Sequence, residues 1–331
     1  MADKGRILRW ALIGCGEIAD RRVAPAISAH PGSELSLVMC RDSDRAGYFA
    51  QKHRAVWSTT RPETLFTDPD IDAVYIATPP GSHCELTLAA AAEGKHVLCE
   101  KPMALTSDEC RRMIEACRAA RVTLGVAYYR RCYPQVQAIR SLLESGKLGK
   151  PLVVRASVAS PFEGRAGDWR LDPSESGGGP LPDIGSHRLD LLAYLFGAPE
   201  RVGAALTPSS AGWPVEEAAT VLLRLPGGVR GVVEAAWNAS APRDLFQIDA
   251  SQGAVRCDPL NGDAYLVSRQ GREERHKVDF PNNVHAPLVA DFVEAILFER
   301  EPICPGEAGT IATRVIEAAY QSAAERRFIP L

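Results

Sequence analysis

Short apolar runs alternate with amphipathic stretches through the first third of the chain. A capping-box sequence, Thr106-Ser107-Asp108-Glu109, begins one helical stretch that reaches Ala120, and an alanine-rich stretch at 85–93 ends before Gly94. The apolar runs have the length and composition of buried strands and lie at 9–13, 35–40, 73–77, 96–99 and 122–126. Strands that alternate with helices predict a parallel sheet joined by right-handed crossovers.

The pattern changes after about residue 127, and strand-like stretches then dominate. They lie at 152–159, 220–225, 229–237 and 246–250. Turn sequences at 226–228 and 261–262 indicate hairpins between neighbouring strands. Helices are predicted at 134–145, 286–298 and 310–325. We therefore expect an α/β protein with a doubly wound parallel sheet over 1–127. An α+β domain with a large, mostly antiparallel open sheet should follow over 128–331.

Composition supports two domains and narrows the class of partner. The chain has 331 residues, 46% of them hydrophobic, and a net charge of -3. This balance gives no general attraction to nucleic acid or an anionic membrane. The nine cysteines contain no CxxC pair, which argues against a disulfide framework or a zinc site. The apolar stretch before Gly14 is too short for a signal peptide, and no segment is long and apolar enough to span a bilayer. We expect a cytoplasmic protein without a metal.

Residues 14–19 read GCGEIA and follow the first predicted strand in the GxGxxG/A form. The first glycine permits a tight turn, the second lets the backbone approach a pyrophosphate, and the small last residue allows helix–strand packing. The positive end of the following helix then faces the phosphates. The motif alone also fits a structural turn. Its place after a strand, with another strand further on, favours a Rossmann dinucleotide site.

The end of the second predicted strand bears on the choice between NAD and NADP. An NAD site usually has an Asp or Glu there that binds the ribose hydroxyls. Cys40 takes that position here and Arg41 follows it, a pair that suits a 2′-phosphate and favours NADP. Alternatively, Arg41 is merely solvated and Asp42 caps the next helix. A register one residue later would make Asp42 the ribose ligand and restore NAD.

Three further motifs carry a family resemblance: 78–83 (TPPGSH), 100–102 (EKP) and 177–187 (GGGPLPDIGSH). Together with the glycine loop they resemble the Gfo/Idh/MocA family of glucose–fructose oxidoreductase, inositol dehydrogenase and rhizopine catabolism proteins. The resemblance covers nearly the whole chain, with further landmarks at 131–134, 145–149 and 318–323. The chain departs from the family pattern at Pro80, where asparagine is common, and at Cys40, where an acid is frequent.

The resemblance implies an N-terminal Rossmann domain, a C-terminal domain on a large open sheet, and oxidation or reduction of sugars, cyclitols or related polyols. It also implies a homodimer or homotetramer formed through that sheet. It assigns Lys101 to the nicotinamide ribose and the substrate hydroxyl, where its charge would stabilise a developing alkoxide. A surface lysine paired with Glu100 is the alternative. Pro102 fixes the turn and permits a cis bond before it.

Asp183 and His187 are four residues apart, which places both on one face of a helical turn. The family's matching histidine is the acid/base, and the matching aspartate binds substrate or orients the ring. The pKa of an unperturbed histidine lies close enough to neutrality for this task. A structural histidine remains an alternative, as does Asp183 capping a helix that begins near Gly185.

The motifs and the resemblance together indicate residues along the cofactor and in the substrate pocket. The expected cofactor residues are Gly14, Cys15, Gly16, Glu17, Ile18, Arg41, Thr78, Pro79, His83, Glu100, Lys101, Trp169 and Arg170. The expected substrate residues are Lys101, Tyr129, Arg131, Asp183 and His187, with Tyr128 and Asp190 as further candidates. For His83 a capping or structural role competes with cofactor contact. Trp169 in the core and Arg170 in solvent are the corresponding alternatives.

The leading hypothesis is an NADP-dependent dehydrogenase or reductase that interconverts a secondary alcohol and a ketone. A trans-dihydrodiol dehydrogenase is one alternative. A glycosidase-like enzyme that retains NAD and uses transient oxidation is another, although the missing ribose acid counts against it. A non-catalytic cofactor-sensing regulator is the third, but such a protein would not need Lys101, Asp183 and His187 together.

Overall fold

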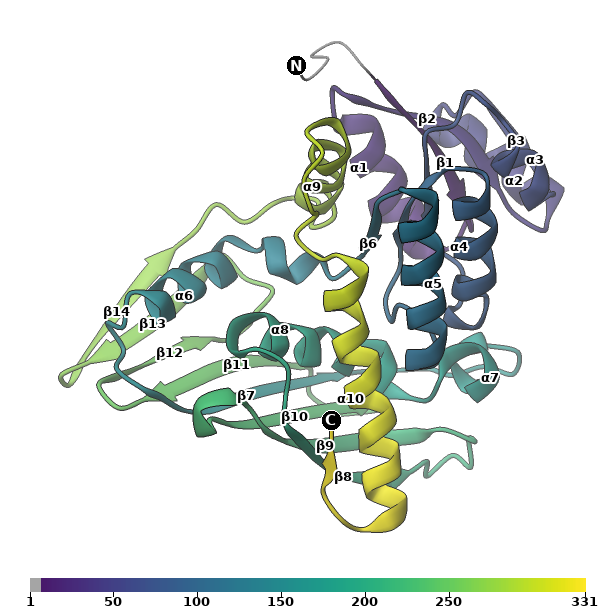
Figure 1. Cartoon of the computed structure of the whole chain (residues 1–331). Coiled ribbons are helices and arrows are strands. Elements are labelled where there is room, and N and C mark those ends of the chain that lie inside the picture. Colours follow the sequence, from purple (N-terminus) through teal and green to yellow (C-terminus); the bar gives the residue numbers. More distant parts are fainter. Residues whose placement is uncertain (1–6) are drawn as a thin grey trace. The chain divides into compact units, whose positions relative to one another are not determined.

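The computed structural model describes residues 7–331 and divides into two compact units (Figure 1). Unit 1 comprises Met1–Tyr129 and Pro281–Thr310, and unit 2 comprises Arg130–Phe280 and Ile311–Leu331. The sequence pattern indicates one boundary near residue 127, whereas residues 281–310 belong to the first unit by their contacts. The start of the chain, on which the expectation of no signal peptide partly rests, lies outside the described residues.

Unit 1 is built on a parallel sheet of six strands in the order β3-β2-β1-β4-β5-β6. This is the doubly wound arrangement predicted for a dinucleotide-binding domain, and the predicted fold class is confirmed. The strands are β1 (Leu8–Ile13), β2 (Ser33–Met39), β3 (Trp57–Thr59), β4 (Ala73–Ile76), β5 (His96–Cys99) and β6 (Leu124–Val126). Only the edge strand β3 was not predicted, because its three residues form no apolar run.

Helices cover this sheet, and the predicted capping box is present. Thr106 Oγ1 accepts from the Glu109 backbone N–H at 3.2 Å, and the Glu109 carboxylate accepts from the Thr106 N–H at 3.1 Å. The helices of unit 1 are α1 (Ala24–Ala29), α2 (Ser43–His53), α3 (Pro62–Phe66), α4 (His83–Ala92), α5 (Ser107–Ala120) and α9 (Ala286–Leu297). α4 packs against α5, and α1 packs against α2 and α9.

The late segment 281–310 joins unit 1 through specific contacts. Phe292 of α9 packs against Trp10 of β1, with ring centroids 5.6 Å apart. A Cβ at Gly125 in β6 would lie 2.8 Å from the Phe292 ring, so glycine is required where the helix approaches this strand. The Val126 N–H donates to the Cys304 carbonyl at 2.9 Å.

Unit 2 contains a sheet of nine strands in the order β14-β13-β12-β11-β7-β10-β9-β8-β15. Only β7 and β10 pair in parallel; the other neighbours are antiparallel, as predicted. The strands are β7 (Pro151–Ser160), β8 (Arg201–Pro208), β9 (Glu216–Arg224), β10 (Arg230–Trp237), β11 (Arg243–Ala250), β12 (Gly253–Cys257), β13 (Ala264–Arg269), β14 (Arg272–Lys277) and β15 (Ile329–Pro330). The edge strand β14 was missed because all of its residues are charged or histidine.

One face of this sheet is apolar and covered by helices. In β9, Ala219, Val221 and Leu223 are buried, and the alternate residues Thr220 and Leu222 are exposed. The helices of unit 2 are α6 (Pro134–Glu144), α7 (Pro173–Ser176), α8 (Ser186–Phe196) and most of α10 (Gly306–Glu325). α8 packs on β7 and β10.

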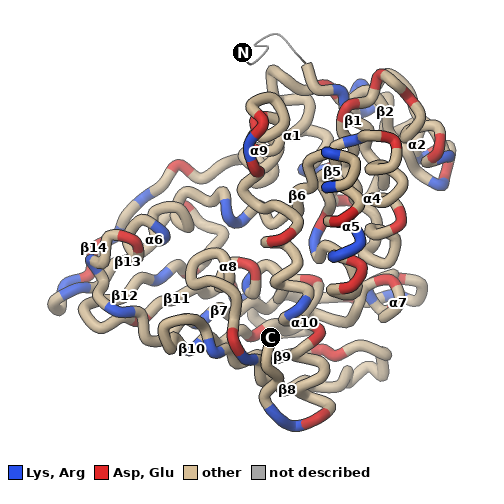
Figure 2. The backbone as a smooth tube through the Cα atoms, in the orientation of Figure 1, with Lys and Arg blue, Asp and Glu red and all other residues tan. Residues whose placement is uncertain are grey.

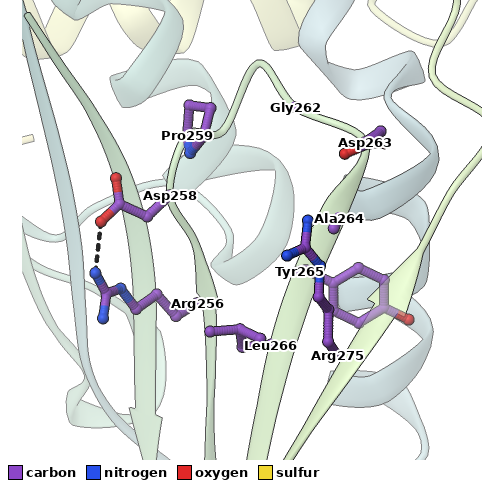
Figure 3. Close-up of a pocket in the computed structure, with 9 residues that line it drawn as sticks. All are labelled: Arg256, Asp258, Pro259, Gly262, Asp263, Ala264, Tyr265, Leu266 and Arg275. Carbon is purple, nitrogen blue, oxygen red and sulfur yellow. Dashed lines mark hydrogen bonds and ion pairs between the residues drawn. The ribbon is translucent and has the colours of Figure 1, made fainter.

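The turn predicted at 226–228 joins β9 to β10. The Asn261-Gly262 turn lies within a longer connection between β12 and β13. A pocket lies at this connection, and its lining includes an ion pair of 2.5 Å between Arg256 and Asp258 (Figure 3). No residue of the predicted site lines this pocket, so it is not the candidate active site.

Acidic and basic positions are interspersed over both units (Figure 2). All nine cysteines are free thiols. Within residues 7–331, no helix has both the length and the apolar character needed to cross a bilayer.

Candidate active site

The loop after β1 has the backbone that a dinucleotide site needs. Gly14 has φ +101°, and a Cβ there would lie 2.5 Å from the Ala77 carbonyl oxygen at the end of β4. Its N–H donates to the Met39 carbonyl at 2.9 Å, which ties the loop to the end of β2. A Cβ at Gly16 would meet no atom within 4 Å, so the protein leaves open the space that a pyrophosphate would take. Helical structure begins at Glu17, as predicted, and continues through a π-helical turn, Ala19–Val23.

The end of β2 has the register expected from the sequence. The strand ends at Met39, Cys40 follows, and Arg41 is exposed. Asp42 is the N-cap of α2, and its Oδ1 accepts from the Arg45 backbone N–H at 2.9 Å. The carboxylate of Asp42 therefore caps the helix, which is the first of the two alternatives for this residue.

His83 connects two of the predicted loops. It is fully buried, with Nε2 2.9 Å from the Thr78 carbonyl oxygen and Nδ1 3.1 Å from the Pro102 carbonyl oxygen. Burial lowers the pKa of this histidine. Both ring nitrogens face protein carbonyls, so the geometry favours the structural alternative over cofactor contact for this side chain.

A buried carboxylate lies directly before Lys101. Glu100 Oε1 accepts from the Tyr75 hydroxyl at 2.8 Å and lies 3.4 Å from His285 Nε2; Oε2 accepts from the Lys101 backbone N–H at 3.2 Å. The His285 ring packs against Tyr129, with centroids 4.5 Å apart. Glu100 thus joins β4, the loop after β5, and the late segment that returns to unit 1.

The charge of Glu100 is stabilised despite its burial. Burial by itself raises the pKa of this carboxyl, but the hydrogen bond and charge of His285, the charge of Lys101 and the Tyr75 hydroxyl lower it below its ordinary value. The peptide bond before Pro102 is cis. Lys101 is partly exposed at the carboxyl end of β5, where ligands of open α/β sheets bind.

In unit 2, Asp183 and His187 lie on one continuous helical segment. Asp183 belongs to a π-helical turn, Leu181–Gly185, and His187 to the first turn of α8, where it is 4% exposed. Gly185 is the N-cap position of α8, and Asp183 lies two residues before it inside the π-helical turn. Asp183 Oδ2 lies 4.0 Å from Nε of Arg170, whose guanidinium stacks over Trp169 at 4.6 Å. The structure therefore brings Asp183 and Arg170 together.

Arg131 and Asp190, both candidates for the substrate pocket, pair with each other. Arg131 donates Nε at 3.0 Å and Nη2 at 2.6 Å to the Asp190 carboxylate, and both side chains are almost fully buried. This two-point ion pair connects the start of unit 2 to α8. Because each charge is committed to the other, the geometry favours a structural tie over direct substrate contact.

Four buried or half-buried side chains that hold the loops of the candidate site have no role predicted from the sequence: Tyr75, Glu216, His285 and Tyr320. Tyr320 falls in a family landmark, but no local pattern marks the other three.

Two family models match the chain. Residues 8–128 match the oxidoreductase family with an NAD-binding Rossmann fold, and residues 136–256 match the GFO/IDH/MocA C-terminal domain. The fold and these matches define a two-domain, NAD(P)-dependent oxidoreductase. The chain belongs to the Gfo/Idh/MocA family, as its motifs indicated.

Individual relatives agree over most of the chain. A 1,5-anhydro-D-fructose reductase of Ensifer adhaerens is 32% identical over 94% of this chain and 96% of its own length. A trans-1,2-dihydrobenzene-1,2-diol dehydrogenase of Bos taurus is 35% identical over 81% of this chain and 79% of its own. The crystal structure of aldose-aldose oxidoreductase from Caulobacter crescentus, complexed with glycerol, has a TM-score of 0.91 and 30% identity. The match covers 98% of this chain and 100% of the aldose-aldose oxidoreductase chain.

Proposed function

We propose that the protein is an NADP-dependent dehydrogenase or reductase that interconverts a secondary alcohol and a ketone in a sugar, cyclitol or related polyol. One observation carries this proposal: Lys101 follows β5 at the carboxyl edge of a sheet whose first loop leaves Gly16 open for a pyrophosphate. Relatives named for a sugar reductase and a sugar oxidoreductase support the substrate class.

The proposed chemistry needs a bound cofactor, a positive charge at the reacting oxygen and an acid/base. When bound, the nicotinamide supplies the hydride acceptor or donor. The residues proposed to hold the cofactor are Gly14, Cys15, Gly16, Glu17, Ile18, Arg41, Thr78, Pro79 and Lys101. The Lys101 ammonium would orient the reacting oxygen and stabilise negative charge that develops on it. His187 would take up or return the hydroxyl proton, and Asp183 would bind substrate or orient the histidine ring.

The preference for NADP rests on the end of β2. A neutral Cys40 at the usual acidic position, an exposed Arg41, and an Asp42 occupied as a helix cap together suit a 2′-phosphate. Arg41→Ala should weaken NADP binding far more than NAD binding, as measured by titration of each nucleotide. Equal weakening would show that Arg41 does not meet the 2′-phosphate.

A trans-dihydrodiol is the second candidate substrate, supported by the named activity of the bovine relative. The deciding experiment mixes the protein with NADP or NAD and a panel of sugars, cyclitols and dihydrodiols, and follows nicotinamide absorbance. Reduction of added cofactor with one compound identifies the class and the preferred nucleotide. If ketone analogues with the reduced cofactor also give no change, the proposed function is wrong.

His187→Ala tests the acid/base assignment. Turnover should fall roughly 100- to 10,000-fold while NADP binding stays nearly intact. Normal turnover in this variant would remove His187 from the mechanism.

We also propose that the outward face of the unit 2 sheet, where Thr220 and Leu222 are exposed, forms a homodimer or homotetramer in the cytoplasm. Nine free thiols suit a reducing compartment. A monomeric mass in solution by light scattering would contradict the assembly, and recovery from an oxidising compartment would contradict the location.

A further inference from the structure

Glu216, the first residue of β9, inserts its carboxylate beneath the glycine-rich segment of unit 2. It is 7% exposed. Its Oε2 accepts from the Gly179 N–H at 2.9 Å, and its Oε1 accepts from the Leu181 N–H at 3.1 Å. The Tyr320 hydroxyl of α10 donates to the same Oε2 at 2.9 Å.

The glycines are there because this carboxylate and its neighbours lie so close. Gly178 has φ +140°, and a Cβ there would overlap the Tyr320 hydroxyl oxygen. A Cβ at Gly179 would overlap the backbone carbonyl oxygen of Glu216. The triple glycine therefore lets the chain pass over Glu216 and Tyr320 at a distance that no side chain permits.

Glu216 also satisfies the backbone donors at the start of a helix. The first turn of a helix has N–H groups without partners inside the helix. In this segment Pro180 and Pro182 have no N–H, and the N–H groups of Gly179 and Leu181 both donate to Glu216. A carboxylate from a distant strand thus performs the task of an N-cap, and its charge suits the positive end of the helix.

The helical segment capped in this way carries the proposed acid/base machinery. It begins at Leu181, passes through Asp183 in the π-helical turn, and continues into α8 with His187. A shift of its first turn would move both side chains. Misplacement of catalytic groups by about 1 Å can cost roughly 100-fold in rate.

We propose that Glu216, held by Tyr320, is a positioning residue of the active site: it sets the first turn of the helical segment that carries Asp183 and His187. This inference rests on the proposed function, in which those two residues perform the chemistry. A purely structural role would lower stability without changing the rate of the folded enzyme.

Glu216→Gln is the principal test. Glutamine preserves the shape of the side chain, but its amide nitrogen cannot accept from an N–H or from a hydroxyl, so the contacts of at least one oxygen are lost. We expect kcat to fall roughly 10- to 100-fold, the pH profile of kcat to shift, and NADPH affinity to change less than 2-fold. The matched control is Glu217→Gln: the adjacent carboxylate accepts from Ser210 instead, and kcat should not change.

Amide hydrogen exchange measures the contact of Glu216 with the glycine segment and needs no activity assay. In Glu216→Gln, the amides of Gly179 and Leu181 should exchange at least 10-fold faster, whereas amides of unit 1 should not change. Tyr320→Phe leaves the carboxylate on both amides and should produce a smaller change in the same direction. If Glu216→Gln fails to fold, Tyr320→Phe and its amide exchange decide the question.

Unchanged exchange at Gly179 and Leu181 would overturn the proposal, and so would faster exchange with an unaltered kcat and pH profile. Failure of the proposed function gives a different pattern. If His187→Ala retains normal turnover, His187 is not the acid/base, yet amide exchange still reports whether Glu216 holds the segment.

Discussion

Each unit of the molecule contains one buried glutamate, and the two glutamates are held differently. Glu100 directly precedes Lys101, and Glu216 contacts the segment that leads to Asp183. Glu100 accepts from the Tyr75 hydroxyl and the Lys101 N–H, and Glu216 accepts from the Tyr320 hydroxyl and two glycine-segment N–H groups. Burial, reinforced by the neighbouring carboxylate, raises the pKa of both tyrosines, so both hydroxyls remain protonated donors.

The difference lies in the third partner. Glu100 faces the side chain of His285, whereas Glu216 accepts from two backbone amides and a hydroxyl. In the first arrangement the hydrogen bond and charge of His285 help to stabilise the carboxylate, and in the second arrangement all three donors are neutral. Unit 1 therefore holds its carboxylate partly by charge, and unit 2 holds its carboxylate by neutral donors.

Among the variants that compare the two glutamate sites, the largest effect should come from Lys101, the residue that Glu100 directly precedes. Lys101→Ala removes the positive charge proposed to stabilise the developing alkoxide, and kcat should fall roughly 100- to 1,000-fold. NADP binding should stay nearly intact in a fluorescence titration. Lys147→Ala, an exposed lysine of unit 2, is the control and should have normal kcat. A Lys101→Ala enzyme with normal turnover would show that unit 1 supplies no such charge.

Substitution of one glycine in each unit should show that the two glycines have different roles. Gly179→Ala places a Cβ on the Glu216 carbonyl oxygen and should reduce the free energy of unfolding by roughly 3 kcal/mol. Gly16→Ala meets no protein atom within 4 Å, so it should cost less than about 1 kcal/mol of stability and instead weaken cofactor binding. Urea unfolding and nucleotide titration of both variants measure this contrast. Similar stability losses in the two variants would refute it.

Acid titration should show that Glu100 is stabilised as an anion. The pKa of Glu100 in the folded protein lies below its ordinary value of 4.5, so its contribution to stability is complete above that value. That contribution is lost as pH falls through the lower, folded-state pKa. Glu100→Gln should therefore flatten the decline in unfolding free energy below about pH 5. Glu93→Gln, at an exposed site, is the control. An unchanged acid slope in Glu100→Gln would mean that Glu100 is not stabilised as an anion.

Removal of the two tyrosine hydroxyls should have modest effects. Tyr75→Phe and Tyr320→Phe each remove one hydrogen bond to a carboxylate that keeps its other donors. Each should cost about 1–2 kcal/mol of unfolding free energy. Only Tyr320→Phe should also speed amide exchange at Gly179. Equal exchange at that amide in both variants would show that Tyr320 does not act on the glycine segment.

Much of unit 1 could be read from local sequence. The strands β1, β2, β4 and β5 and the capping box at Thr106 can each be recognised from a few neighbouring residues. The same holds for the glycine loop, because turn geometry and helix start are decided by neighbouring residues. In unit 2, the strands that were not predicted are β8, β12, β13, β14 and β15. β14 is charged throughout and β12 and β15 are short, so these three carry little apolar signal.

The sequence by itself determined the family, the Rossmann sheet, and the motifs that carry Lys101, Asp183 and His187. Only the tertiary structure decided which side chains hold them. Glu216 reaches Gly179 across 37 residues, and His285 reaches Glu100 across 185. Hydrophobic periodicity reports which face of an element is buried. It does not report which distant polar groups meet there, since that depends on how the elements pack.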